Sequence, residues 1–382
     1  MKNMTMLILI GVLGITFVLK CEGNTGNSPF ANKRAILDGD IGLWTKKEEL
    51  DQRLIRIKEA GFNVYMPAVW YGRGTTWPSR IAPWDFTLTA KGTKDFDPLR
   101  YAIAKAHELG LEIHPWFTVV LQWKRTFLPE FGLDGVSEGQ FGAFNVHDAS
   151  FREFMKSLIT EVVSNYNIDG INLDYGRAMG LCTSSLCQQE YRILYNRNLL
   201  VDSLAFKLSP QKVPTLIQYQ ELAVRALIKS ISASAKKIKP ALLVSVDAHP
   251  ELARYEQGQN SIDWANSGLV DVVFMMNYHP ALDPVVIETV RSKMSNPKEL
   301  TLLISNMAYG ADLSENQKPF PRSGKWLSET IAMIATRWPD TGIAVYFYKY
   351  LSDEQISALK AGTFRGSPDR EPPHMPELLS VR

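Results

Sequence analysis

The sequence predicts a closed barrel of eight parallel strands alternating with helices, the (β/α)8 fold, also called the TIM barrel. Eight strand-like apolar runs alternate along the chain with longer segments of helical periodicity. The chain has 382 residues, which is enough for one such barrel. A glycine fingerprint of the G-x-G-x-x-G type does not follow the first strand, which argues against an open dinucleotide-binding sheet.

The elements follow from apolar periodicity and from their boundary residues. Strands are expected at residues 35–43, 62–70, 111–117, 168–174, 242–247, 270–276, 300–306 and 343–348. The clearest helices are expected at residues 46–60, 98–109, 150–166, 218–238 and 324–337. Gly61 and Gly110 suit left-handed caps, while Thr45 and either Asp148 or Ser150 suit N-caps.

Three connections are too long to be simple turns. They follow strands 2, 3 and 4, at residues 71–97, 118–149 and 175–215. All three start where a strand ends, and that face of a barrel carries the active site. We therefore expect the functional residues on these loops and at the strand ends that precede them.

The N-terminus has the pattern of a secretory leader. Lys2 precedes an apolar run from Met6 to Leu19, and residues 22–24 are small or polar. The run is shorter than the roughly 20 residues of a bilayer span, so we expect export without a stable membrane span. Residues 1–23 are then removed and the protein is secreted or periplasmic. Residues 24–362 form one domain, and residues 363–382 form a Pro-rich tail.

The three cysteines suggest two further features. Cys21 could carry a lipid instead of leaving with the leader, although Lys20 before it fits such processing poorly. Cys182 and Cys187 lie in the loop after strand 4 and could close a small disulfide ring after export, or remain two free thiols. The sequence says nothing about the oligomeric state.

Composition excludes several classes of partner and cofactor. The charged fraction is 21% and the net charge is +2, so the chain as a whole has no strong attraction to nucleic acid or anionic membranes. The six histidines are spread along the chain, and no second Cys or His pair matches the two loop cysteines. We therefore expect no metal and no cofactor.

Side-chain alternation along the strands places two carboxylates inside the barrel. Apolar neighbours suit the helix layer, so Asn172 and Asp174 face inward and Asp174 lies at the mouth. The same pattern places Asp247 at a neighbouring strand end. Two such carboxylates could supply the acid and base, or acid and nucleophile, of glycosidic cleavage. Alternatively, Asp174 pairs with Arg177 as a buried ion pair and Asp247 makes a cap or loop hydrogen bond.

Aromatic and polar residues gather around the same strand ends. Aromatic faces stack on pyranose rings, while His, Asn and Arg bind hydroxyl groups, so the mixture favours a carbohydrate ligand. The expected substrate-binding residues are Tyr71, His114, Trp116, Tyr175, Arg177, Asn277, Tyr278 and Tyr348.

The chain resembles the bacterial glycosyl-hydrolase-like family 10 proteins in a set of motifs. These are AGFNVYMP at residues 60–67, SRIAPW at 79–84, FDPL at 96–99, GLEIHPWF at 110–117, and the segment from EVV at 161–163 to DGINLDY at 169–175. The resemblance covers residues 35–362. It implies a barrel glycosidase that acts on a bacterial cell-wall or extracellular polysaccharide, with Asp174 catalytic.

The chain departs from the family pattern at one position that matters. Family members often carry a second acid directly after the residue matching Asp174, whereas this chain has a tyrosine there. Asp247 is the first candidate for the partner of Asp174, and Glu251, Asp38 or Asp40 could replace it. If the catalytic pair is incomplete, the barrel would bind polysaccharide without cleaving it.

Overall fold

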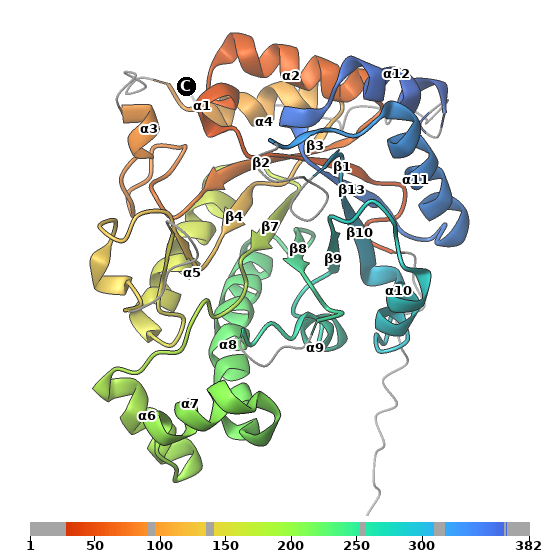
Figure 1. Cartoon of the computed structure of the whole chain (residues 1–382). Helices are drawn as coiled ribbons and strands as arrows, with labels where there is room; N and C mark the ends of the chain where they lie inside the picture. The colour runs from red at the N-terminus through yellow and green to blue at the C-terminus, as the bar shows by residue number, and fades with distance from the viewer. Residues whose placement is uncertain are drawn as a thin grey trace, which may run out of the picture.

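Figure 1 shows the computed structural model, in which a ring of parallel strands is surrounded by helices. The structure describes residues 28–89, 96–134, 141–252, 257–308, 318–362 and 364. The expected leader lies outside these residues, as does the expected tail apart from Phe364. Within the described part, no helix is both long and apolar enough to cross a bilayer.

The described strands close into the predicted barrel. Each pairs in parallel with its neighbour in the order β1, β13, β10, β9, β8, β7, β4, β2, and β2 pairs with β1 to close the ring. The third barrel position is shared by the short strands β3 and β4. The barrel strands are β1 (Arg34–Asp38), β2 (Val64–Trp70), β3 (Glu112–Ile113), β4 (Trp116–Thr118), β7 (Gly170–Asp174), β8 (Leu243–Ala248), β9 (Val272–Asn277), β10 (Leu300–Ser305) and β13 (Ile343–Tyr346).

Helices cover the outside of the barrel. Most of the helices pack on its apolar outer face, where the largest buried cluster lies between strands and helices. The helices of the described residues follow in chain order. They are α1 (Ile41–Trp44), α2 (Lys47–Glu59), α3 (Phe86–Thr89), α4 (Pro98–Glu108), α5 (Ala149–Asn165), α6 (Ser185–Tyr195), α7 (Leu199–Leu208), α8 (Pro214–Ile238), α9 (Ser261–Asn266), α10 (Pro284–Arg291), α11 (Gly324–Arg337) and α12 (Asp353–Ala361).

Short elements lie in the connections. Two antiparallel pairs join β5 (Leu121–Gln122) with β6 (Gly142–Ala143) and β11 (Met307–Ala308) with β12 (Phe320–Pro321). The 3-10 turns are η1 (Pro129–Phe131), η2 (Pro210–Lys212), η3 (Pro297–Glu299) and η5 (Tyr348–Tyr350).

The other strand ends lie within two residues of the prediction, and the first, third and last strands differ for reasons that the structure shows. The first strand ends at Asp38, because the chain turns at Gly39 and residues 41–44 form α1. The third is divided between β3 and β4 around Pro115, which has no N–H to donate to a sheet. The last ends at Tyr346 and is followed by η5.

Most of the expected helix boundaries are confirmed. Gly61 and Gly110 have φ angles of 90° and 67°, the left-handed region expected of helix caps. Asp148 caps α5 by accepting a hydrogen bond from the Ser150 N–H. Thr45 is not an N-cap as predicted, because its hydroxyl donates to the Ile41 carbonyl and α2 begins after residue 46.

The connection after β7 forms a separate helical insertion. Helices α6 and α7 lie beside the N-terminal end of the long helix α8 and project from the barrel (Figure 1). Cys182 and Cys187 form a disulfide here, which confirms one of the two predicted possibilities. A small apolar cluster holds the insertion together, and its buried members are Cys182, Cys187, Tyr191, Leu199, Val213, Leu216 and Tyr219.

Candidate active site

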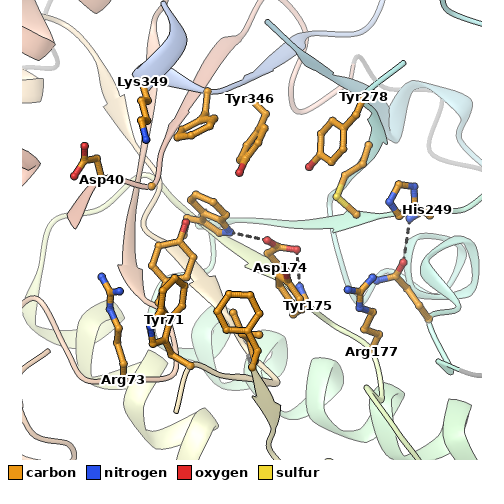
Figure 2. Close-up of a pocket in the computed structure, with 18 residues that line it drawn as sticks. Asp40, Tyr71, Arg73, Asp174, Tyr175, Arg177, His249, Tyr278, Tyr346 and Lys349 are labelled. Atoms are coloured by element: carbon orange, nitrogen blue, oxygen red, sulfur yellow. Dashed lines mark hydrogen bonds between the residues drawn. The ribbon is translucent and has the colours of Figure 1, made fainter. Parts of the chain in front are cut away.

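A cavity of about 650 Å³ opens at the C-terminal ends of the barrel strands. Figure 2 shows Asp174 near its centre, with Asp40 and Lys349 on one side and His249 and Arg177 on the other. Its lining residues come from the ends of most of the barrel strands and from the loops that follow them: Gly39, Asp40, Tyr71, Arg73, Trp116, Leu121, Trp123, Phe141, Asp174, Tyr175, Arg177, His249, Gln259, Met276, Tyr278, Tyr346, Phe347 and Lys349.

Asp174 ends β7 and reaches the cavity floor. Its Oδ2 accepts a hydrogen bond of 3.2 Å from Trp116 Nε1, and its Oδ1 accepts one of 2.6 Å from the Tyr175 N–H. Burial raises the pKa of this carboxyl from 3.8 to about 6, although the two hydrogen bonds and the charge of Arg177 oppose the rise. Asp174 therefore exchanges its proton close to neutral pH, which is what acid or base catalysis requires.

Tyr175 adopts a backbone conformation that is unusual for its residue type. Its φ angle is 51°, in the left-handed region that side chains with a Cβ rarely occupy. In this conformation its N–H donates to the Asp174 side chain, and its ring lies 4.7 Å from the Arg177 guanidinium. The strained residue thus fixes the orientation of the carboxylate.

Asp247 lies beneath the cavity floor. Its Oδ1 accepts a hydrogen bond of 2.9 Å from Asn172 Nδ2, which also lies 3.1 Å from Ser245 Oγ. The side chain is 1% exposed and does not line the cavity, whereas Gln259, which bonds the Asp247 backbone carbonyl, does. Burial and then the neighbouring charge of Asp174 raise its pKa well above the usual range.

One wall of the cavity is a packed group of aromatic rings. Tyr71 stands edge-on to Trp116 at 5.4 Å between ring centroids and lies 5.8 Å from Trp123. Trp123 in turn lies 4.7 Å from Phe141. Gly39 lets Tyr71 approach closely, since a Cβ at this position would lie 2.6 Å from its hydroxyl oxygen. The rings offer flat apolar surface beside the Asp174 carboxylate.

The facing wall also presents aromatic side chains. Tyr278 and Tyr346 follow β9 and end β13, and their ring centroids are 5.3 Å apart. Tyr346 also stands edge-on to Trp116 at 6.4 Å, so it connects the two walls. Burial and the nearby Tyr346 and Asp174 raise the pKa of Tyr278 well above 10, which keeps its hydroxyl available as a neutral hydrogen-bond donor.

Basic side chains stand around the rim. Arg73 lies 4.6 Å from the Trp123 ring and forms a 2.6 Å ion pair with the buried Asp85. Lys349 belongs to η5 and lines the cavity near Asp40 (Figure 2). The Asp40 carboxylate lies 3.8 Å from the Arg53 guanidinium and is 31% exposed. Two carboxylates, Asp40 and Asp174, thus line the cavity among the described residues.

The structure brings together six of the ten residues that the sequence analysis selected. Asp174, Tyr71, Trp116, Tyr175, Arg177 and Tyr278 all line the cavity. Asp247, His114, Asn277 and Tyr348 do not.

The structure places three of these four residues in other parts of the barrel. His114 is buried inside the opposite end of the barrel, where a Cβ at Gly170 would lie 2.7 Å from its Nδ1. Asn277 lines an adjacent cavity of about 460 Å³. Tyr348 lies beyond the last strand, where Arg53 stands 4.5 Å from its ring, and Tyr346 takes the expected place.

Several cavity residues were not predicted as site residues. Trp123 and Phe141 lie in the long connection after β4, whose length was the available signal. His249, Gln259 and Lys349 follow barrel strands and could have been found by reading beyond each strand end. No group of three or more potential metal ligands is present among the described residues.

Comparisons with known proteins agree with this architecture. A family model described as glycosyl hydrolase-like 10 matches residues 36–130 and 143–320. Glycosyl hydrolase DigH of Escherichia coli K12 is 22% identical in an alignment 286 residues long, which covers 62% of this chain and 58% of that protein. Glycosyl hydrolase YngK of Bacillus subtilis is 26% identical in an alignment 146 residues long, which covers 35% of this chain and 29% of that protein. The matches span less than two thirds of these relatives.

Solved structures share the fold at low identity. The glycoside hydrolase domain of PgaB from Bordetella bronchiseptica superposes with a TM-score of 0.61 at 11% identity, covering 86% of this chain and 98% of that one. The catalytic domain of β-amylase from Paenibacillus polymyxa gives a TM-score of 0.59 at 12% identity, with 88% and 98% coverage.

Proposed function

This chain belongs to the glycosyl hydrolase-like 10 family, and we propose that it is a glycosidase cleaving O-glycosidic bonds of a bacterial cell-wall or extracellular polysaccharide. The observation that supports catalysis best is Asp174, a carboxyl group with a pKa of about 6 on the floor of a cavity walled by aromatic rings. Such rings suit the apolar faces of sugars, and such a carboxyl suits proton transfer to the glycosidic oxygen.

In this proposal Asp174 acts as the proton donor. Its protonated form is populated up to about pH 6, and the hydrogen bonds from Trp116 and Tyr175 hold it in one orientation. When the glycosidic bond breaks, the proton passes from the carboxyl to the leaving oxygen. The resulting carboxylate is then stabilised by both N–H donors and by the positive charge of Arg177.

A second carboxylate is needed on the other face of the sugar, and Asp40 is our candidate. It lines the same cavity, whereas Asp247 is covered and would act only through the groups around Asp174. Its side chain is 31% exposed and lies 3.8 Å from the Arg53 guanidinium, so it can contact a water molecule or the sugar. We assign Asp247 the role of a positioning residue.

Release of reducing ends from denuded peptidoglycan and a panel of exopolysaccharides tests the proposal. The wild type should cleave at least one of them, while Asp174→Asn and Asp40→Asn should each lose at least about a hundredfold in rate. With an aryl glycoside whose leaving group needs no proton, Asp174→Asn should recover much of its rate and Asp40→Asn should not. Failure of Asp40→Asn to lose activity would remove Asp40 from the mechanism.

The pH dependence gives a second test. If protonated Asp174 is the donor, kcat/KM should fall as the pH rises through about 6. A descending limb at that pH in the wild type, absent with the activated aryl substrate, would support the assignment. An ascending limb there would mean that Asp174 works as a base or nucleophile instead.

A barrel that only binds polysaccharide is the competing function. It is favoured by Tyr175, because the family resemblance implies a second acid directly after Asp174 and this chain has a tyrosine there. In that case a polysaccharide from the panel would bind the wild type and Asp174→Asn equally well, and no reducing ends would appear. Cleavage by the wild type that Asp174→Asn abolishes would exclude it.

We also propose that the protein acts outside the cytoplasm. Support comes from the apolar run between Met6 and Leu19 and from the disulfide between Cys182 and Cys187, a bond that oxidising compartments favour. N-terminal sequencing of exported protein should begin after Gly23. A chain that still begins at Met1 would contradict removal of the leader, and a lipid on Cys21 would replace secretion by anchoring.

A further inference from the structure

Helix α7 turns an apolar face toward solvent. The exposed fractions are 43% for Leu200, 61% for Val201, 64% for Leu204 and 89% for Leu208. Leu204 and Leu208 follow Leu200 by four and eight positions and Val201 by three and seven, so the four residues lie on one side of the helix. The buried side contains Leu199 and the charged Asp202. This is the reverse of an ordinary surface helix, which buries its apolar stripe.

Helix α6 of the same insertion also exposes apolar side chains. Leu186, Ile193 and Leu194 are 69%, 75% and 51% exposed, while Cys187 and Tyr191 of this helix are buried. The described part of the chain has 16 exposed large hydrophobic side chains, and 7 of them lie on these two short helices. Scattered exposed leucines need no explanation, but such a concentration indicates a binding surface. We call these seven residues of α6 and α7 the apolar patch.

Basic residues occur in the same segment as the apolar patch. The segment 185–212 contains Arg192, Arg197, Lys207 and Lys212 against two acids, a net charge of +2 that equals the charge of the whole chain. Both acids already have partners. Asp202 is buried and forms a 2.6 Å ion pair with Arg197, and Glu190 accepts a 2.7 Å hydrogen bond from the Tyr219 hydroxyl.

We propose that the apolar patch docks on the surface of a bilayer that contains anionic phospholipid. Aliphatic side chains flanked by Lys and Arg are the composition of helices that lie in a membrane interface. In this position the leucines enter the acyl boundary, while Lys207, Lys212 and Arg192 meet the phosphate groups. A second copy of this chain fits less well, because a symmetric contact would bring the same basic residues face to face.

The insertion that carries the apolar patch lies on the mouth side of the barrel. Helix α8 has 25 residues and is about 37 Å long, whereas the six residues of β8 span about 20 Å. Because α8 ends where β8 begins, its N-terminal part extends beyond the mouth, and α6 and α7 lie beside that part (Figure 1). The insertion thus extends on the order of 15 to 20 Å beyond the mouth.

Co-sedimentation with vesicles tests the docking without any activity assay. The full chain is mixed with vesicles of phosphatidylcholine alone or of phosphatidylcholine with phosphatidylglycerol. The patch variant is Leu204→Gln/Leu208→Gln, since glutamine preserves helix propensity. The matched control is Val285→Gln/Met333→Gln, which replaces two exposed apolar residues of α10 and α11. Circular dichroism and thermal unfolding confirm that both variants fold.

The wild type and the control should bind the anionic vesicles. The patch variant should partition at least about tenfold less, because burial of one leucine is comparable in free energy to one tenfold step in an equilibrium. Lys207→Gln/Lys212→Gln should also weaken binding, and added salt should weaken it further. The proposal is overturned if the wild type does not bind, if the patch variant binds equally, or if light scattering shows a dimer that the patch variant disrupts.

Discussion

Replacing Asp174 with asparagine should inactivate the protein and, above pH 6, also stabilise it. The carboxyl is 8% exposed, and burial raises its pKa from 3.8 to about 6. A group whose folded pKa is raised stabilises the fold below pH 3.8, and this contribution is lost as the pH rises through about 6. Asparagine has the same shape and no charge, so it avoids that loss.

The size of the effect follows from the pKa rise. A shift from 3.8 to about 6 corresponds to about 3 kcal/mol between the two ends of the titration. The variant has an opposing cost, because both carboxylate oxygens accept hydrogen bonds from N–H groups and the asparagine amide can accept only one of them. That cost is roughly 1 to 2 kcal/mol and does not depend on pH.

Thermal unfolding of the two proteins at pH 4 and pH 8 measures both terms. Asp174→Asn should be less stable than the wild type at pH 4, and more stable by roughly 1 to 2 kcal/mol at pH 8. The Tm of the variant minus the Tm of the wild type should therefore rise by roughly 4 °C from pH 4 to pH 8 for a chain of this size. Comparing the proteins at each pH cancels the other titrating groups.

Two outcomes would refute the reasoning. If the difference in Tm is the same at both pH values, ionisation of Asp174 does not destabilise the fold, and burial does not raise its pKa. If the variant is much less stable at pH 8, the carboxylate is a structural ion-pair partner, and its inactivation would not show a catalytic role.

Three further predictions concern Asp247, the disulfide of the insertion after β7, and Gly39 in the cavity. Asp247→Asn should keep kcat/KM within about tenfold of the wild type, because a buried carboxyl with a raised pKa is already neutral; a loss as large as that of Asp174→Asn would make it catalytic. Replacing both Cys182 and Cys187 by serine should lower the free energy of unfolding by up to about 2 kcal/mol, measured in denaturant, since the ring they close is short; an unchanged midpoint would contradict this. Gly39→Ala should lower kcat/KM at least about tenfold by displacing the Tyr71 hydroxyl, and adding Tyr71→Phe should restore part of the loss; no rescue would mean that the clash is not the cause.

The fold could be predicted from the sequence because the barrel repeats one simple pattern. Each strand is an apolar run, and each helix shows its own periodicity, so the pattern predicts the elements without knowledge of their contacts. The errors fell where local chemistry overrides that pattern. Pro115 interrupts the third strand, and the chain leaves the first strand at Gly39 to form α1.

Alternation along a strand predicts which way a side chain points but not what covers it. It placed Asn172, Asp174 and Asp247 inside the barrel, and all three are there. It could not show that the Asp247 side chain, 1% exposed and bonded to Asn172, stays outside the cavity that Asp174 lines. Alternation also does not give the depth of a side chain. His114 faces inward but lies beside Gly170 at the start of β7, so it does not reach the cavity.

The insertion after β7 also bears on how such a barrel can diversify. Tyr191, Leu199 and Tyr219 pack in a cluster of their own, apart from the cluster between strands and helices. A lineage can therefore lengthen, exchange or lose these helices with little effect on the packing beneath Asp174. Barrels with the same residues around Asp174 could then carry different insertions and bind to different surfaces.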